Sequence, residues 1–315
     1  MCNELQKGLP ICSRPFAILA KSVGSDEEAV LQQIAQLKKD GLIRRIAALI
    51  NHRALGKTST LATAHVTQES LQEVAEAVNA LEGVSHNYLR KHHYNLWFTL
   101  QGRSFEEIRL TLSNLSGRFG INFHSLPVTH VFKLDVRFDA EDQSQLAEDV
   151  ADVPTSETVK LSESEKRILS KLQEDLDLTA KPFDFLCNEG FGAEDALQVI
   201  QELIDKGAIR RIAAVVNYRK LGFVHNVMFA SEVPQSRVVE ASKRLARFRI
   251  VSHCYERKTF EGWPYNMFAM MHAVSMGDIQ RVIDKFVEAE NIDSYELLAT
   301  AEELKKRPVK HRFQQ

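Results

Sequence analysis

Cationic side chains recur in two long, matched segments of the chain. The segment GLIRRIAALINHRALG at residues 41–56 returns as GAIRRIAAVVNYRKLG at residues 207–222. Guanidinium groups form bidentate, charge-assisted hydrogen bonds to carboxylates, so a repeated set of arginines indicates a ligand with several acidic groups. Solvated charges on an edge strand are the alternative explanation for any single arginine. The candidate binding residues of this motif are Arg44, Arg45, Arg53, Arg210, Arg211, Asn217 and Arg219.

A second repeated segment follows each arginine motif and is rich in rings. SHNYLRKHHYNLWFTL begins at Ser85, and SHCYERKTFEGWPYNMFAMM begins at Ser252. Aromatic walls beside cations suit a planar molecule with carboxylates on its rim: a carboxylated tetrapyrrole fits, and a nucleotide also meets the description. Core packing would explain Trp97 equally well, whereas the repeated Tyr-Asn pairs need polar partners if they are buried. The candidate binding residues here are Arg90, Lys91, Tyr94, Trp97, Arg257, Lys258, Trp263, Tyr265 and Asn266.

Histidines supply the candidates for proton transfer, because imidazole titrates near neutral pH. The catalytic candidates are His52, His92, His93, His225 and Tyr218, which takes the place of His52 in the second copy. An imidazole can also bind a haem-type iron axially, so acid and iron ligand remain alternatives for the same residues. The second copy is favoured for catalysis because its aromatic motif is fuller.

The repeat indicates two copies of one α+β domain pair rather than a solenoid of short units. In each copy, helices and a basic strand predict a winged helix-turn-helix, and strand, helix, two strands, helix, strand predict a ferredoxin-like βαββαβ domain. Helical periodicity predicts helices at 26–39, 161–173 and 194–206. The last strand of the second ferredoxin-like domain is expected at 292–300. The first copy lacks most of the helix at 161–173. The expected domains are a winged helix at 1–57, a ferredoxin-like domain at 58–139, a linker at 140–160, a second winged helix at 161–221 and a second ferredoxin-like domain at 222–315.

Composition limits the classes of partner. The net charge is −2, and the presumed recognition helices begin with acidic residues at Asp26 and Glu194, which would repel a phosphate backbone. We therefore expect no nucleic-acid partner. No run of about 18 apolar residues is present, so no membrane partner is expected. The four cysteines are scattered without a CxxC pair, which favours a reducing cytoplasm over disulfide or metal sites.

A winged helix followed by such a domain resembles the Lrp/AsnC regulators, and IRRIAAVVNYRKLG with WPYNMF resembles the siroheme decarboxylases of that superfamily. The resemblance covers nearly the whole chain. It implies the fused two-subunit form associated with d1-type haem synthesis, an internal pseudo-dimer, and removal of the C12 and C18 acetate carboxyl groups of siroheme. It also implies no cofactor, because the iron arrives within the substrate. Assembly into a homo-oligomer stays open.

Two other functions compete with the decarboxylase. The first is an Lrp/AsnC-type transcriptional regulator that binds a small effector, which the acidic recognition helices disfavour. The second is a tetrapyrrole binder without chemistry, which shares every pocket feature and differs only in turnover.

Overall fold

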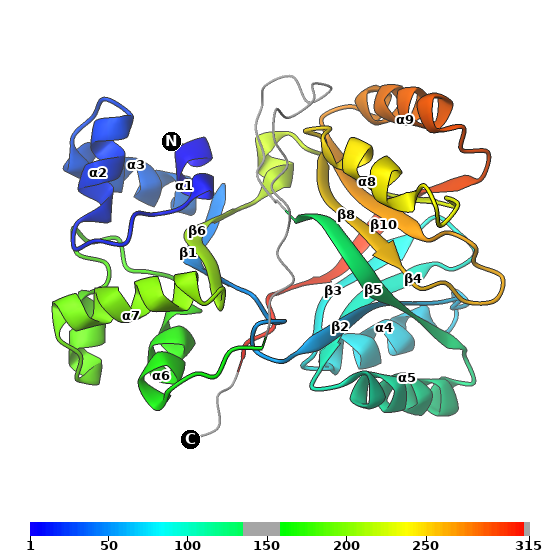
Figure 1. Cartoon of the computed structure of the whole chain (residues 1–315), viewed down its shortest axis with the longest axis horizontal. Helices are drawn as coiled ribbons and strands as arrows, with labels where there is room; N and C mark the ends of the chain where they lie inside the picture. The colour runs from blue at the N-terminus through cyan, green and yellow to red at the C-terminus, as the bar shows by residue number, and fades with distance from the viewer. Residues whose placement is uncertain (135–157, 312–315) are drawn as a thin grey trace. The chain divides into compact units, whose positions relative to one another are not determined.

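Each of the two copies contributes to both compact units of the fold. The computed structural model describes residues 1–134 and 158–311; residues 140–157 of the expected linker lie outside this part. A winged-helix unit contains the described parts of Met1–Gly56, Ser156–Leu221 and Lys310–Gln315, and a barrel unit contains those of Lys57–Thr155 and Gly222–Val309. Equivalent domains from the two copies therefore pair with each other (Figure 1).

The winged-helix unit is built from helices whose ends carry strong local signals. Asp26 accepts a hydrogen bond from Ala29 N at 2.8 Å at the start of one helix, and Ser162 and Glu165 form a capping box at the start of another. The elements are α1 (Cys2–Lys7), α2 (Pro15–Ser22), α3 (Glu27–Lys39) and β1 (Ile43–Ile50), then α6 (Glu163–Leu172), the 3-10 helix η1 (Asp184–Glu189), α7 (Ala193–Asp205), β6 (Ile209–Val216) and η2 (Tyr218–Leu221). The three helices expected here are confirmed within a few residues. The first helix of copy one is shorter, as α1 has 6 residues and α6 has 10, but the expectation that most of it is missing was wrong.

The two basic strands pair with each other. β1 and β6 run antiparallel, with Ala47 opposite Ala213. Chain segments that precede the second helix of each copy cross to the other copy: Leu9 N donates to Ile212 O at 2.7 Å, and Leu176 N donates to Ile46 O at 2.8 Å. Neither strand is therefore an isolated, solvent-exposed edge strand, because each one is hydrogen-bonded to backbone segments of the other copy.

The barrel unit contains both expected βαββαβ domains. The first copy supplies β2 (Thr58–Ala64), α4 (Leu71–Ala80), β3 (Val84–Arg90), β4 (Leu96–Gly102), α5 (Phe105–Phe119) and β5 (Phe123–Leu134). The second supplies β7 (His225–Ser231), α8 (Val238–Ala246), β8 (Val251–Arg257), β9 (Met267–Ala273), α9 (Met276–Glu290) and β10 (Tyr295–Lys306). The last strand reaches Lys306 rather than residue 300, because its second half pairs with the other copy.

Exchange of these last strands closes the barrel. The strand order is β10-β3-β4-β2-β5-β8-β9-β7, and β7 also pairs with β10. β5 hydrogen-bonds to β2 of its own copy and then to β8, whereas β10 hydrogen-bonds to β7 and then to β3. Closure leaves no strand edge in this sheet unpaired.

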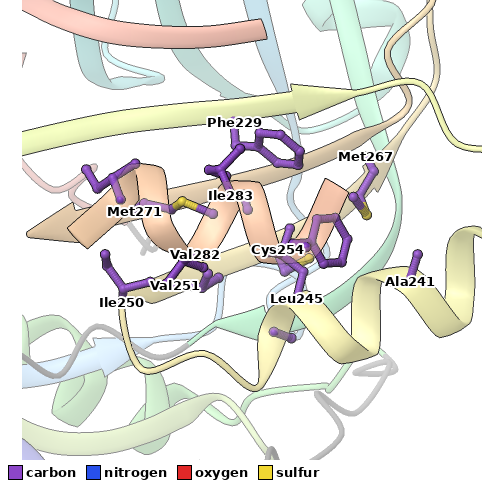
Figure 2. Close-up of a cluster of buried hydrophobic side chains, with 14 of the residues drawn as sticks. Phe229, Ala241, Leu245, Ile250, Val251, Cys254, Met267, Met271, Val282 and Ile283 are labelled. Atoms are coloured by element: carbon purple, nitrogen blue, oxygen red, sulfur yellow. The ribbon is translucent and has the colours of Figure 1, made fainter. Parts of the chain in front are cut away.

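Alternating residues of these strands face two different cores. Val227 and Phe229 pack outward under α8 and α9, in the cluster that Figure 2 shows around Cys254 and Met271. Met228 and Ala230, one position away, belong to an inner cluster that also contains Trp97, Trp263, Leu126 and Leu298. The aromatic motif of the sequence therefore folds into the inside of the barrel.

Two equivalent lysines on the exchanged strands fasten the helices of the opposite copy. Lys133 Nζ of β5 donates to the carbonyls of Ala246 and Phe248 at the end of α8, at 2.8 and 3.1 Å. Lys305 Nζ of β10 donates to Asn79 O and Leu81 O at the end of α4, at 2.6 and 3.2 Å. An ammonium group at a helix C-terminus satisfies open carbonyls and complements the helix dipole.

We expect Lys305→Met to lower the free energy of unfolding by about 1–2 kcal/mol, because it removes a cation from the end of α4 and leaves two carbonyls without this donor. Urea denaturation followed by circular dichroism measures the change. Lys285→Met, on the exposed face of α9, is the matched control and should be close to neutral. Equal midpoints for the two variants would contradict the role of Lys305.

Candidate functional site

A cluster of rings lies where β4 and β9 begin. Tyr94, just before β4, contacts Phe260 and Trp263 of the loop before β9, with ring centroids 5.3 and 5.8 Å apart. His124 of β5 stacks on Phe260 at 4.0 Å, and His92 stands edge-on to Trp263 at 5.5 Å. We call these five residues the ring cluster. The first copy supplies His92, Tyr94 and His124, and the second copy supplies the other two.

The asparagine of each Tyr-Asn pair holds its loop in place. Asn95 accepts from Val66 N at 2.9 Å and donates to Val66 O at 2.8 Å. Asn266 makes the same two bonds with Val233, again at 2.9 and 2.8 Å. Each side-chain amide therefore bonds to both the N–H and the C=O of a valine that follows the neighbouring strand. These bonds hold the loops of Tyr94 and Tyr265 without any ligand.

Three imidazoles of the first copy, those of His92, His93 and His124, contact Tyr94, and His65 stacks on His93. Hydrogen bonds assign the tautomers of two of the four. Tyr94 N donates to Nδ1 of His92 at 3.0 Å, so the proton of neutral His92 is on Nε2. His65 Nδ1 is 2.7 Å from the carbonyl of His93, so Nδ1 donates, and the lone pair of neutral His65 is on Nε2. His65 and His93 stack at 4.3 Å. Burial lowers the pKa of the fourth imidazole, His124, from its usual 6.5.

His65 and His124 were not among the candidate residues predicted from the sequence. Both lie at strand ends, where the second copy has Glu232 and Glu296 at the matching positions. They fall outside the two repeated segments, so motif comparison could not find them. A position-by-position comparison of strand ends would have marked them as charge-changing differences between the copies.

The two arginines of the ring-rich motif are buried in the barrel. Arg90 is 3% exposed and donates to Leu298 O at 2.5 Å and to Thr300 Oγ1 at 3.2 Å. Arg257 is 9% exposed and donates to Leu126 O at 2.9 Å. Each guanidinium thus contacts the exchanged strand of the other copy. Their neighbours Lys91 and Lys258 are exposed.

Of each arginine pair on the basic strands, one side chain is exposed and the other half-buried. Arg44 and Arg210 are exposed, whereas Arg45 and Arg211 are half-buried, as the alternation of a strand predicts. Arg45 donates to Gln173 O at 3.1 Å, and burial lowers its pKa although Asp175 and Glu174 act in the opposite direction.

His52 lies in the winged-helix unit among cations. Burial, then the charges of Arg210, Arg53 and His311, lower its pKa to about 4. His52 is therefore neutral at pH 7 and a poor proton donor there. Its counterpart Tyr218 is 1% exposed, Asn217 is half-buried and Arg219 is exposed.

His225 lies in the barrel unit, half-buried at the start of β7. The next residue, Asn226, links a buried polar row: its Nδ2 is 3.3 Å from Nδ1 of His272, and its Oδ1 accepts from Thr300 at 2.9 Å. Burial first, then the charges of His253, Lys306 and Arg90, hold the pKa of His272 well below 6.5. His272 was not among the candidate residues predicted from the sequence, because the matching residue of copy one, Gln101, carries no imidazole.

Within 1–134 and 158–311, no group of three or more His, Cys, Asp or Glu side chains is placed to hold a metal ion. A hollow of about 390 Å³ is lined by residues from Asp177 to Asn188 and includes none of the candidate residues. None of the helices in this part of the chain has the length and hydrophobicity needed to cross a membrane.

Comparison with protein families matches most of this architecture. The AsnC-like ligand binding domain matches residues 54–133 and 220–305, and the siroheme decarboxylase NirDL-like HTH domain matches residues 2–44. The siroheme decarboxylase of Hydrogenobacter thermophilus is 35% identical over 98% of this chain and 92% of its own length. The siroheme decarboxylase alpha subunit of Desulfovibrio desulfuricans is 40% identical, but over 46% of this chain and 83% of its own length.

Solved structures give the same result. The crystal structure of the siroheme decarboxylase NirDL superposes with a TM-score of 0.74 at 33% identity, covering 98% of this chain and 92% of that one. The same enzyme in complex with an iron-uroporphyrin III analogue superposes with a TM-score of 0.73 at 32% identity. The duplicated α+β fold expected from the sequence is thereby confirmed.

Asn95→Asp and Asn266→Asp should each lower the free energy of unfolding by about 1–3 kcal/mol, because a carboxylate cannot donate to the carbonyl of Val66 or Val233. Chemical denaturation of the two variants measures this, and their effects should be similar because the bonds match. Asn188→Asp, at an exposed position, is the control. A small effect for Asn266→Asp together with weaker ligand binding would instead favour a ligand contact.

His52 should titrate near pH 4 in an NMR titration, and Arg210→Gln should raise its pKa by removing a neighbouring positive charge. The folded pKa lies below the usual 6.5, so the unfolded chain binds the proton more readily. Stability from this group is complete above pH 6.5 and falls as the pH drops towards 4. The variant His52→Gln should lose that part of the pH dependence, and an unchanged pH profile would contradict the assignment.

Proposed function

Because the chain belongs to the siroheme decarboxylase family, we propose that it is a carboxy-lyase that removes the C12 and C18 acetate carboxyl groups of siroheme. The product is then 12,18-didecarboxysiroheme, an intermediate of haem d1 or alternative haem formation. The ring cluster carries the proposal, since it joins aromatic walls to two imidazoles in one unit of the fold, with the stacked pair His65 and His93 beside Tyr94.

The reaction needs a proton but no oxidant. The bond between the acetate methylene and its carboxyl carbon breaks, and the electron pair flows into the tetrapyrrole as CO₂ leaves. A proton then forms the C–H bond of the resulting methyl group, so the oxidation state of the iron does not enter the balance. No cofactor is part of the proposal, because siroheme brings its own iron.

We assign proton delivery to the imidazoles of the first copy, although the sequence had favoured the second. His65 suits the role best, because its Nδ1–H stays on the His93 carbonyl while Nε2 gains and loses a proton. His93 stacks against it, which suits a shared proton reservoir. Nδ1 of His92 accepts from the backbone, so the proton of its neutral form is on Nε2, and His92 serves better as a hydrogen-bond donor than as an axial ligand to the substrate's iron.

Cations would orient the substrate through its other carboxylates. Among the candidates of the barrel unit, Lys91 and Lys258 are exposed and therefore suited to a ligand. Arg45, Arg90 and Arg257 donate to backbone carbonyls, so a mainly structural role is the better proposal for them.

The competing functions lack comparable support. For a DNA-binding regulator, α3 and α7 would present acidic first turns to phosphates, with Glu27 already paired to Arg14. A tetrapyrrole binder without turnover would need the rings but has no use for several imidazoles beside them.

Anaerobic incubation of the purified chain with siroheme, followed by mass spectrometry of the tetrapyrrole, tests the function. The expected product has lost the mass of two CO₂ molecules. Loss of one would restrict the proposal to a single acetate, and unchanged mass with a shifted Soret band would leave a binder.

His65→Gln should lower kcat by about 10²–10⁴-fold if this imidazole delivers the proton. His130→Gln, an exposed histidine of β5 outside the ring cluster, is the matched control.

A further inference from the structure

The two tryptophans of the chain differ in their hydrogen bonding. Both are buried inside the barrel, Trp97 at 1% and Trp263 at 2% exposure, with ring centroids 5.3 Å apart. The indole N–H of Trp97 donates to Tyr94 O at 2.6 Å. The indole Nε1 of Trp263 is equally inaccessible and has no acceptor among the described residues. A buried N–H without a partner is costly, so it points to an acceptor that comes from outside the chain.

The surroundings of Trp263 are aromatic. Its ring is within 4.8 Å of Tyr265 and 5.8 Å of Tyr94, both nearly perpendicular, and Phe260 lies roughly parallel at 6.2 Å. His92 stands perpendicular at 5.5 Å and carries its proton on Nε2. The rings of Trp263 and His92, each with an N–H group, thus lie next to each other among aromatic rings.

Neutral donors suit a carboxylate that must leave as neutral CO₂. A guanidinium would stabilise the carboxylate charge before the reaction and lose that interaction as the charge moves into the tetrapyrrole. An indole N–H orients the carboxylate with a weaker interaction, and apolar walls withhold the water that would otherwise solvate it.

Resting on the proposed function, we propose that Trp263 Nε1–H and His92 Nε2–H bind the acetate carboxylate that is lost, while exposed lysines of the barrel unit bind carboxylates that are retained. The bond that breaks is then the one between this carboxyl carbon and its methylene, and the proton comes from a separate imidazole. Trp263 is by this assignment a substrate-binding residue that selects acetate over smaller side chains.

Indole NMR tests the proposal on the intact chain. Protein with ¹⁵N-labelled tryptophan gives one indole N–H signal for each of Trp97 and Trp263, and Trp97→Phe assigns them. The probes are metal-free uroporphyrin III, which carries acetates and propionates, and coproporphyrin III, in which methyl groups replace the acetates. We expect uroporphyrin III to move the Trp263 signal downfield and coproporphyrin III to leave it nearly unchanged.

Equal shifts with both porphyrins, or binding of uroporphyrin III without a shift, would overturn the role of Trp263 but leave the proposed function standing. Such a result would assign the acceptor to water or to a retained propionate. Failure of both porphyrins to bind, followed by visible absorption, would count against the proposed function itself and against this inference with it.

Variants provide a second readout. Trp263→Phe keeps a ring and removes the N–H, so the preference for uroporphyrin III over coproporphyrin III should fall by about tenfold to a hundredfold. Trp97→Phe, whose lost N–H served Tyr94 O, should preserve this preference even if the protein is less stable. Because the preference is a ratio of affinities, it does not depend on the fraction of folded protein. An unchanged ratio in Trp263→Phe would overturn the assignment.

Discussion

The fold depends on the exchange of the last strand between the two copies. β5 leaves its own sheet to pair with β8, and β10 does the same with β3, so neither sheet is complete without the other copy. Lys133 and Lys305 reinforce this exchange by binding the helix ends of the opposite copy. The buried Arg90 and Arg257 extend it inside the barrel, where each donates to a carbonyl of the exchanged strand. Cations that the sequence assigns to a ligand therefore also serve the pairing of the copies.

The same exchange brings unlike loops together. Duplication preserves the strands and the two asparagine bridges, whereas the loops before β4 and β9 have diverged. The first copy brings His92, His93 and Tyr94, and the second brings Phe260 and Trp263 to the same cluster. One copy thus carries the imidazoles and the other the indole with an open donor. A duplicated chain can specialise in this way, because each change is not repeated in its partner.

The architecture was largely accessible from the sequence. Capping residues such as Asp26 and Ser162, glycines after the helices, and alternating apolar residues each act over a few positions, so they predict elements locally. Strand exchange is a long-range property: nothing in residues 292–306 states that half of the strand will pair with β3. For that reason the expected end of the last strand was too early.

The site was harder to predict, because a repeated polar residue signals a shared constraint without saying which kind. Asn266 was predicted as a ligand contact, and in the fold its amide oxygen and nitrogen each form a hydrogen bond with Val233, which is a structural constraint of its own. A sequence repeat also identifies only residues that the two copies share. His65 and His124 distinguish the copies, and only the folded chain brings His65 to His93 and His124 to Tyr94 and Phe260.

The proposed catalysis needs loops of both copies in one barrel. Its most direct test is siroheme turnover by the two copies produced as separate chains, residues 1–139 and 140–315, alone and mixed. We expect that neither chain alone decarboxylates siroheme and that mixing restores the activity of the intact protein. Full turnover by either chain alone would contradict it.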